Sequence, residues 1–150
     1  MTQPFLVVRS RRVVTETIAP AAIHIRAGMI ERVAAWDDVP AGARLEDIGE
    51  FAVLPGLVDT HVHLNEPCRT EWEGFATATR AAAVGGVTTL VDMPLNSIPP
   101  TTTREAFAAK RAAATGQCAV AVGSGAAWCP ATRASWRASS PTVCAASSAS

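Results

Sequence analysis

The chain has 150 residues, and its 13 lysines and arginines balance its 13 aspartates and glutamates, which gives a formal net charge of zero. This length suits one ordinary domain, and the neutral charge argues against binding to nucleic acid or to an anionic membrane, so a small molecule is the expected partner. The N-terminus lacks the pattern of a secretory signal, and no apolar run reaches the roughly 18 to 20 residues of a membrane helix. We therefore expect a cytoplasmic protein.

From residue 5 to about residue 53, short apolar stretches are separated by turn residues. Ile23 and Ile25 alternate with His24 and Arg26, and a tight turn follows at residues 27–28, which is typical of an antiparallel hairpin with one wet face. We predict a small β-layer over residues 1–54.

After Pro55 the pattern changes to strands alternating with helices, which predicts a parallel sheet, either open or closed into a barrel. The first strand is expected over residues 56–63, and a helix over residues 70–83 begins at a capping box of Thr70 and Glu73. Trp72 and Phe75 have helical spacing and are predicted core residues.

Gly85 and Gly86 are expected to end the first helix, and a second strand should follow over residues 87–93. A capping box of Thr102 and Glu105 predicts a helix to about residue 114, closed by Gly116 and followed by a third strand over residues 118–122. These three β/α units define a second segment, residues 55–123. No periodicity follows, so residues 124–150 are predicted to be a disordered tail.

Two histidines, His61 and His63, lie at the carboxyl end of the first predicted strand. Residues two apart in a strand share a face, so both imidazoles can bind one metal ion. A pair of exposed or hydrogen-bonded histidines is the alternative, but β/α barrels build their active sites from these strand ends, which favours metal binding. Two imidazoles do not complete a zinc site, and His24 belongs to the β-layer.

Three other polar residues are candidates on this rim. Asp59 could be a ligand, a support for the ligands or a helix cap, and Asp92 is expected to give structural support. For Asn96, a substrate contact and a loop-capping role both remain open. The cysteines have no C-x-x-C spacing, so we predict free thiols and no thiolate zinc cluster; they are Cys68, Cys118, Cys129 and Cys144.

Longer motifs surround the histidines: Pro-Gly-Leu-Val-Asp-Thr-His-Val-His, Asn-Glu-Pro-Cys-Arg-Thr-Glu-Trp-Glu-Gly-Phe from residue 65, and Asp-Met-Pro-Leu-Asn-Ser from residue 92. In these the chain resembles the cyclic amidohydrolases, in which a small β-sandwich precedes a (β/α)8 TIM barrel, and within that group it resembles allantoinases over residues 5–123. Dihydroorotases typically have an arginine where this chain has Asn65. Allantoinases usually have glycine where it has Cys68, which bears on the geometry of that loop.

The resemblance implies an α/β metallohydrolase of purine catabolism that opens the ring of allantoin to allantoate. It implies two metal ions, commonly zinc, bound by the His-x-His pair, a carboxylated lysine, two later histidines and a late aspartate that shuttles protons. Only His61 and His63 carry over as ligands. No catalytic residue does, so the chain is expected to be an inactive fragment with an incomplete barrel. Intact members are expected to be homo-oligomers.

Two other readings remain open. The chain could come from a dihydroorotase-like or hydantoinase-like cyclic amidohydrolase, although Asn65 and the Trp-Glu-Gly-Phe run disfavour this. It could instead be non-catalytic, either a pseudogene product or a subunit that uses its β-layer for assembly.

The segment after Gly123 departs from the family pattern in a way that a reading-frame shift explains. Loss of one T from TTC TGG GGC GGC GTG GTG CCC GGC AAC converts Phe-Trp-Gly-Gly-Val-Val-Pro-Gly-Asn into Ser-Gly-Ala-Ala-Trp-Cys-Pro-Ala-Thr, which is the sequence observed from residue 124. The same shift turns a lysine-bearing Gly-Phe-Lys-Cys-Phe-Leu motif into the final Ser-Ser-Ala-Ser and a stop. We predict that residues 124–150 are out of frame, by mutation or by sequencing error.

Overall fold

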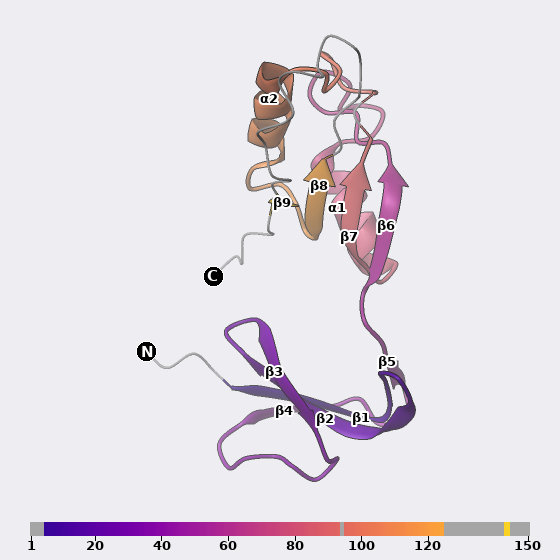
Figure 1. The fold of residues 1–150 in the computed structure, drawn as a ribbon, viewed down its shortest axis with the longest axis vertical. Helices are drawn as coiled ribbons and strands as arrows, with labels where there is room; N and C mark the ends of the chain where they lie inside the picture. Colours follow the sequence, from indigo (N-terminus) through magenta and orange to yellow (C-terminus); the bar gives the residue numbers. More distant parts are fainter. Residues whose placement is uncertain (1–4, 94, 125–142, 145–150) are drawn as a thin grey trace. The chain divides into compact units, whose positions relative to one another are not determined.

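The computed structural model describes residues 5–93, 95–124 and 143–144. The chain forms two compact units, Met1–Pro55 and Gly56–Ser150, and the division falls one residue from the boundary expected from the sequence. Figure 1 shows the elements of each unit along the chain.

The first unit is a single mixed sheet. Its strands are β1 (Leu6–Val14), β2 (Ile18–Arg26), β3 (Met29–Ala34), β4 (Arg44–Asp47) and β5 (Ala52–Val53). The order is β3-β2-β1-β4, and β5 also pairs with β1. The two antiparallel pairings, β1 with β2 and β2 with β3, confirm the predicted hairpin region.

Two features of this unit differ from expectation. Strands β4 and β5 run parallel to β1, a pairing between distant segments that local patterns do not encode. A β-sandwich needs two layers, whereas the described residues of this unit form one sheet. One small core cluster is formed by Val13, Ala21 and Ile23, and the β3 side chains Met29, Ile30 and Val33 are exposed.

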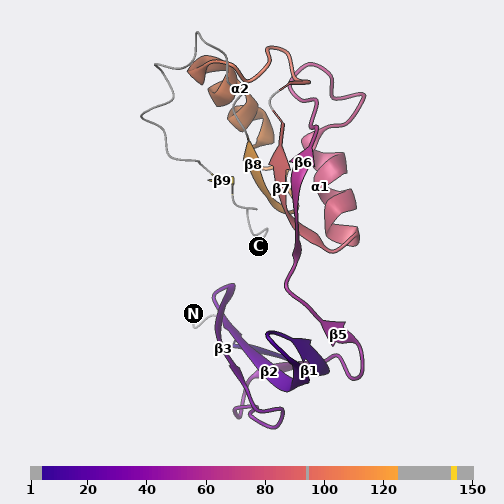
Figure 2. The same ribbon diagram turned by 45° about the vertical axis from the view of Figure 1, so that its right-hand side comes forward.

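The second unit has the predicted alternation of strands and helices. Its elements are β6 (Leu57–Val62), α1 (Phe75–Val84), β7 (Val87–Asp92), α2 (Arg104–Ala114), β8 (Ala121–Ser124) and β9 (Val143–Cys144). Strands β6, β7 and β8 are parallel neighbours, which confirms the β/α prediction (Figure 2). Both helices pack on one face of this sheet, because one core cluster joins them to β7 and β8: Leu64, Phe75, Leu90, Ala114, Val120 and Val122. Neither helix is long and apolar enough to cross a membrane.

The helix starts differ from the predicted capping boxes. Helix α1 begins at Phe75 with Gly74 as its N-cap, so the prediction of a start at Thr70 is wrong. Trp72 is consequently outside the helix and 65% exposed, whereas Phe75 is in the core as predicted. The N-cap of α2 is Thr103, whose Oγ1 accepts a hydrogen bond from the Ala106 amide at 3.1 Å, one residue after the predicted Thr102.

Both helices end where the sequence predicts, and one glycine is required by a close approach. Gly85 is the C-cap of α1, and Gly86 and Gly116 have positive φ angles of 80° and 75°. At Gly56, just before β6, a Cβ would lie 2.2 Å from the side chain of Thr88 on β7. Only glycine therefore lets β6 enter beside β7 without displacing its neighbour.

The predicted tail is not uniformly without structure. Ser124 belongs to β8, and β9 pairs antiparallel with β8, so the expectation of disorder is wrong for Val143–Cys144. The exposed edge of β8 offers free backbone groups, which explains how a segment without strand periodicity can pair there. The third strand also begins at Ala121, three residues later than predicted. Residues 125–142 and 145–150 lie outside the described part of the chain.

Candidate metal site

His61 and His63 lie at the carboxyl end of β6. Both are exposed, and their ring centroids are 5.4 Å apart with an interplanar angle of 78°. When two imidazoles bind the same tetrahedral zinc ion with Zn–N distances of about 2 Å, their ring centroids are roughly 5 Å apart. The spacing of the two rings therefore suits a shared ion.

The contacts of Asp92 are to groups other than the two histidines. Val62 pairs with Asp92, and Asp92 pairs with Ser124, so these three residues share the face on which the core cluster packs. Strand β6 has a register shift between Asp59 and Val62 and ends at Val62, so the register assigns neither histidine to a face. The carboxylate of Asp92 is bound to Lys110 and to the Leu64 amide, which agrees with the structural support predicted for it.

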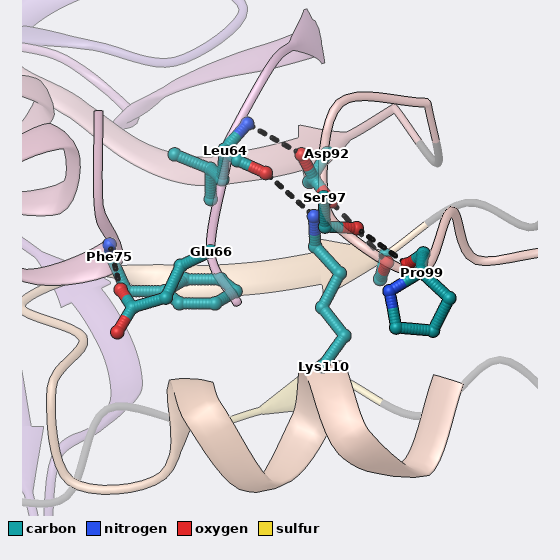
Figure 3. Close-up of polar contacts among 8 residues, drawn as sticks. Leu64, Glu66, Phe75, Asp92, Ser97, Pro99 and Lys110 are labelled. Atoms are coloured by element: carbon teal, nitrogen blue, oxygen red, sulfur yellow. Dashed lines mark hydrogen bonds and ion pairs between the residues drawn. The ribbon is translucent and has the colours of Figure 1, made fainter. Parts of the chain in front are cut away.

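Asp92 and Lys110 form a buried ion pair on the helix side of the sheet (Figure 3). The Lys110 Nζ lies 2.8 Å from Asp92 Oδ2 and donates a hydrogen bond to the Leu64 carbonyl at 2.6 Å. Asp92 Oδ1 accepts from the Leu64 amide at 2.7 Å, and Ser124 Oγ lies 3.5 Å from Oδ2. Burial raises the pKa of Asp92, and the hydrogen bond from Lys110 opposes that rise.

Asp59 also contacts backbone beside the histidines. Its Oδ1 accepts a hydrogen bond from the His61 amide at 3.0 Å, so its observed role is to hold the backbone of β6 and not to cap a helix. A register shift between Asp59 and Val62 places Asp59 opposite Leu90. The sequence position alone could not separate these roles, because they depend on where the strand bulges.

The structure does not bring Asn96 to the histidine pair through any described contact. Asn96 is half-buried, and its carbonyl lies 3.4 Å from Arg69 Nη1, so a substrate contact remains a prediction. Asn65 is closer in sequence and 6% exposed, and its Oδ1 has no hydrogen-bond partner among the described residues. The backbone amide of Asn65 donates a hydrogen bond to the Glu73 carbonyl at 2.9 Å.

The donors present fit half of a metal site. Within residues 5–93, 95–124 and 143–144, no group of three or more His, Cys, Asp or Glu side chains could hold a metal ion. Lys110 does not fit the role of the bridging lysine, because its ammonium is bound to Asp92 and to the Leu64 carbonyl. Among the described residues, Cys68 and Cys118 are not joined in a disulfide. Further ligands would have to come from outside the described residues.

Residues 52–149 match the Amidohydrolase family. The chain belongs to this family. The match includes most of the range predicted to be out of frame. With the parallel β/α units described above, it supports the expected α/β fold class, the opening units of a barrel that is incomplete in this chain.

Within this family, the chain is similar to allantoinases in sequence and to a hydantoinase in structure. The chain is 61% identical over 120 residues to "Allantoinase" from Streptomyces avermitilis, covering 79% of this chain and 27% of that protein. It is 52% identical over 118 residues to "Allantoinase, mitochondrial" from Aquarana catesbeiana, covering 77% and 24%. The solved L-hydantoinase (dihydropyrimidinase) from Arthrobacter aurescens superposes with a TM-score of 0.71 at 31% identity, covering 83% and 27%. The chain thus spans about a quarter of the length of these curated relatives.

Proposed function

We propose that this chain is the N-terminal part of an allantoinase-type amidohydrolase, which opens the hydantoin ring of allantoin to allantoate in the cytoplasm. The observation that carries the proposal is the 61% identity to an allantoinase over 120 residues. An alignment of that length in a chain of 150 residues includes the middle of the chain, where His61 and His63 lie.

In this function, His61 and His63 would hold zinc with ligands that lie outside the described residues. Bound zinc would polarise the ring carbonyl and lower the pKa of a water molecule. Asp59 holds the His61 amide, and Asp92 holds the Leu64 amide, so the backbone on both sides of the pair is fixed. A bridging lysine and a proton-shuttling aspartate are not supplied by these residues, so we propose that the 150-residue chain alone is inactive.

A hydantoinase-type activity is the second candidate. The solved L-hydantoinase that superposes on this chain favours it, at 31% identity. Both reactions hydrolyse a ring amide, so the two candidates differ in the substrate's side group and not in the chemistry.

The test uses the full-length product of the locus, with the reading frame restored if the gene carries a single-base gap. We expect hydrolysis of allantoin to exceed that of hydantoin and dihydroorotate, and His61→Asn and His63→Asn to abolish it and to lower the zinc content per subunit. Glu50→Gln, an exposed change in the other unit, should leave both unchanged. Preference for hydantoin would favour the second candidate, and full activity of the histidine variants would contradict both.

A further inference from the structure

The backbone that follows His63 is hydrogen-bonded, at both its amide and its carbonyl, to the two residues of one buried ion pair. The Leu64 amide donates to Asp92, and the Leu64 carbonyl accepts from Lys110 (Figure 3). These two groups belong to consecutive peptide units, His63–Leu64 and Leu64–Asn65. Leu64, Asp92 and Lys110 are 1%, 0% and 1% exposed, so water does not compete for these bonds.

These side-chain hydrogen bonds begin where strand β6 ends. Strand β6 ends at Val62, whose carbonyl accepts from the Met93 amide at 2.7 Å. Beyond that bond, Leu64 has no strand neighbour among the described residues, and the side chains of Asp92 and Lys110 bind its backbone groups instead. His63 therefore lies between the last backbone bond of the sheet and the first side-chain bond beyond it.

Position 110 of helix α2 is occupied by a lysine and not by an apolar residue or an arginine. Lys110 is the only lysine in a chain whose other basic residues are arginines. It lies in the middle of α2, where an apolar side chain would pack without the cost of burying a charge. A compact ammonium can reach a carbonyl and a carboxylate at one point, whereas the planar guanidinium of arginine needs more room.

We propose that the Asp92–Lys110 pair is a positioning device for the metal-binding histidines, acting through the Leu64 backbone. The proposal rests on the metal-binding role given to His61 and His63 above. The described hydrogen bonds of the pair go to the Leu64 backbone and to Ser124 and not to the histidines, so it acts without binding the ion itself. Partners that orient metal ligands typically change metal affinity 10- to 100-fold when they are removed.

The test is a titration of the 150-residue chain with Zn²⁺ alone, followed by NMR signals of the imidazoles. In the unchanged chain, we expect the signals of His61 and His63 to shift together, while those of buried His24 do not. The variant Asp92→Leu/Lys110→Met replaces both charges with apolar groups, so it leaves no single charge buried and is compatible with folding. In this variant the dissociation constant for Zn²⁺ should rise at least about 10-fold.

Thr79→Val is the matched control. Thr79 is equally buried, and its hydroxyl accepts from the Ala119 amide at 3.0 Å and donates to the Phe75 carbonyl at 2.5 Å. These hydrogen bonds do not include Leu64, so this variant should lose stability and keep the affinity for Zn²⁺. If the double variant does not fold, Asp92→Asn takes its place; it keeps an oxygen for the Leu64 amide and removes the charge that orients Lys110. We expect it to weaken Zn²⁺ binding by a smaller factor.

The outcomes separate this proposal from the proposed function. Equal affinity for Zn²⁺ in the unchanged chain and in the folded double variant, or in Asp92→Asn where that variant replaces it, would overturn the positioning role and leave the metal site standing. A loss of affinity in Thr79→Val as large as that in the pair variants would reduce the effect to general stability and would also overturn it. Absence of any joint shift of His61 and His63 would show that the two histidines do not bind Zn²⁺ in this chain and would overturn the positioning role, whereas the zinc content of the full-length histidine variants tests the metal site itself.

Discussion

At the scale of single residues, Cys68 is in a conformation that favours glycine. Its φ angle is +76°, and L-residues with a Cβ pay roughly 1–2 kcal/mol in this region. The resemblance to allantoinases leads us to expect glycine at this position, and glycine adopts such a φ angle without strain. We expect Cys68→Gly to raise the free energy of unfolding by about 0.5–1 kcal/mol, since part of the gain is offset by the greater freedom of glycine in the unfolded chain.

Urea denaturation of the two proteins measures this difference. Cys68→Ser is the control, because serine keeps the Cβ and removes only the sulfur, and it should leave the unfolding midpoint nearly unchanged. Equal stability of the glycine and serine variants would show that the loop is not strained at Cys68.

Some residues of the candidate site could be predicted from the sequence and others could not. The two-residue spacing of His61 and His63 is a local signal, and it led to the pair directly. Lys110 lies 46 positions from Leu64, and only its being the one lysine in the chain set it apart. Contacts of this kind depend on how α2 packs on the sheet, which no local pattern encodes.

At the scale of elements, helix α1 is capped from outside its own sequence. Glu66 Oε2 accepts from the Phe75 amide at 2.9 Å, and its Oε1 accepts from Gln117 Nε2 at 3.0 Å. One carboxylate therefore ties the loop after β6 to the start of α1 and to the turn before β8. We expect Glu66→Ala to lower the free energy of unfolding by about 1–2 kcal/mol, as loss of a helix cap does.

Thermal unfolding of Glu66→Ala and Glu66→Gln measures this effect. Glutamine keeps one oxygen that can accept from Phe75, so it should lose about half as much as alanine. A cost for alanine no larger than that of an exposed substitution such as Glu71→Ala would argue against the cap.

The first unit contains an ion pair that links β4 to β1 and gives a test by pH. The guanidinium of Arg9 donates to Asp47 at 2.9 Å, and with the Gly49 amide it lowers the pKa of Asp47 below its ordinary value of 3.8. The unfolded chain therefore binds this proton more readily than the folded one. The stabilisation is present above pH 3.8 and is lost as pH falls through the lowered pKa.

Asp47→Asn should accordingly be less stable than the unchanged chain near neutral pH, and the gap should close at strongly acidic pH. Urea midpoints at a series of pH values give the measurement, and added salt should narrow the gap at neutral pH because the pair is exposed. A gap that is constant down to the most acidic pH would assign the effect to the shape of the amide and not to the charge.

Strand and helix positions in the second unit followed from periodicity, but helix starts did not. Thr70 with Glu73 and Thr102 with Glu105 both have capping-box spacing, yet Gly74 and Thr103 are the caps. The cause for α1 is tertiary, since Glu66 satisfies the first helical amide from nine residues away. The parallel pairing of β4 and β5 with β1 is likewise a contact between distant segments.

At the scale of the whole molecule, large apolar side chains are exposed in both units. Met29 and Ile30 on β3 are 70% and 64% exposed, and Leu57 and Val58 on β6 are 60% and 59% exposed. Three parallel strands cannot close a barrel, and β6 is an edge strand of its sheet. Such surfaces favour self-association, so the 150-residue chain should bind an apolar dye, and its apparent size in size-exclusion chromatography should increase as its concentration is raised.

Whether later strands of the barrel cover this exposed apolar surface depends on the reading frame of the gene after Gly123. If residues 124–150 are out of frame, sequencing the gene across the Gly123 codon will show a single-base gap, and restoring the base will encode the lysine-bearing motif and the later strands of the barrel. The longer product should then be monodisperse, because the later strands would cover the apolar residues of β6, and it should bind zinc and hydrolyse allantoin. An in-frame gene without a nearby gap would contradict the frameshift, and a monodisperse 150-residue chain that does not bind the dye would show that this surface is stable as it stands.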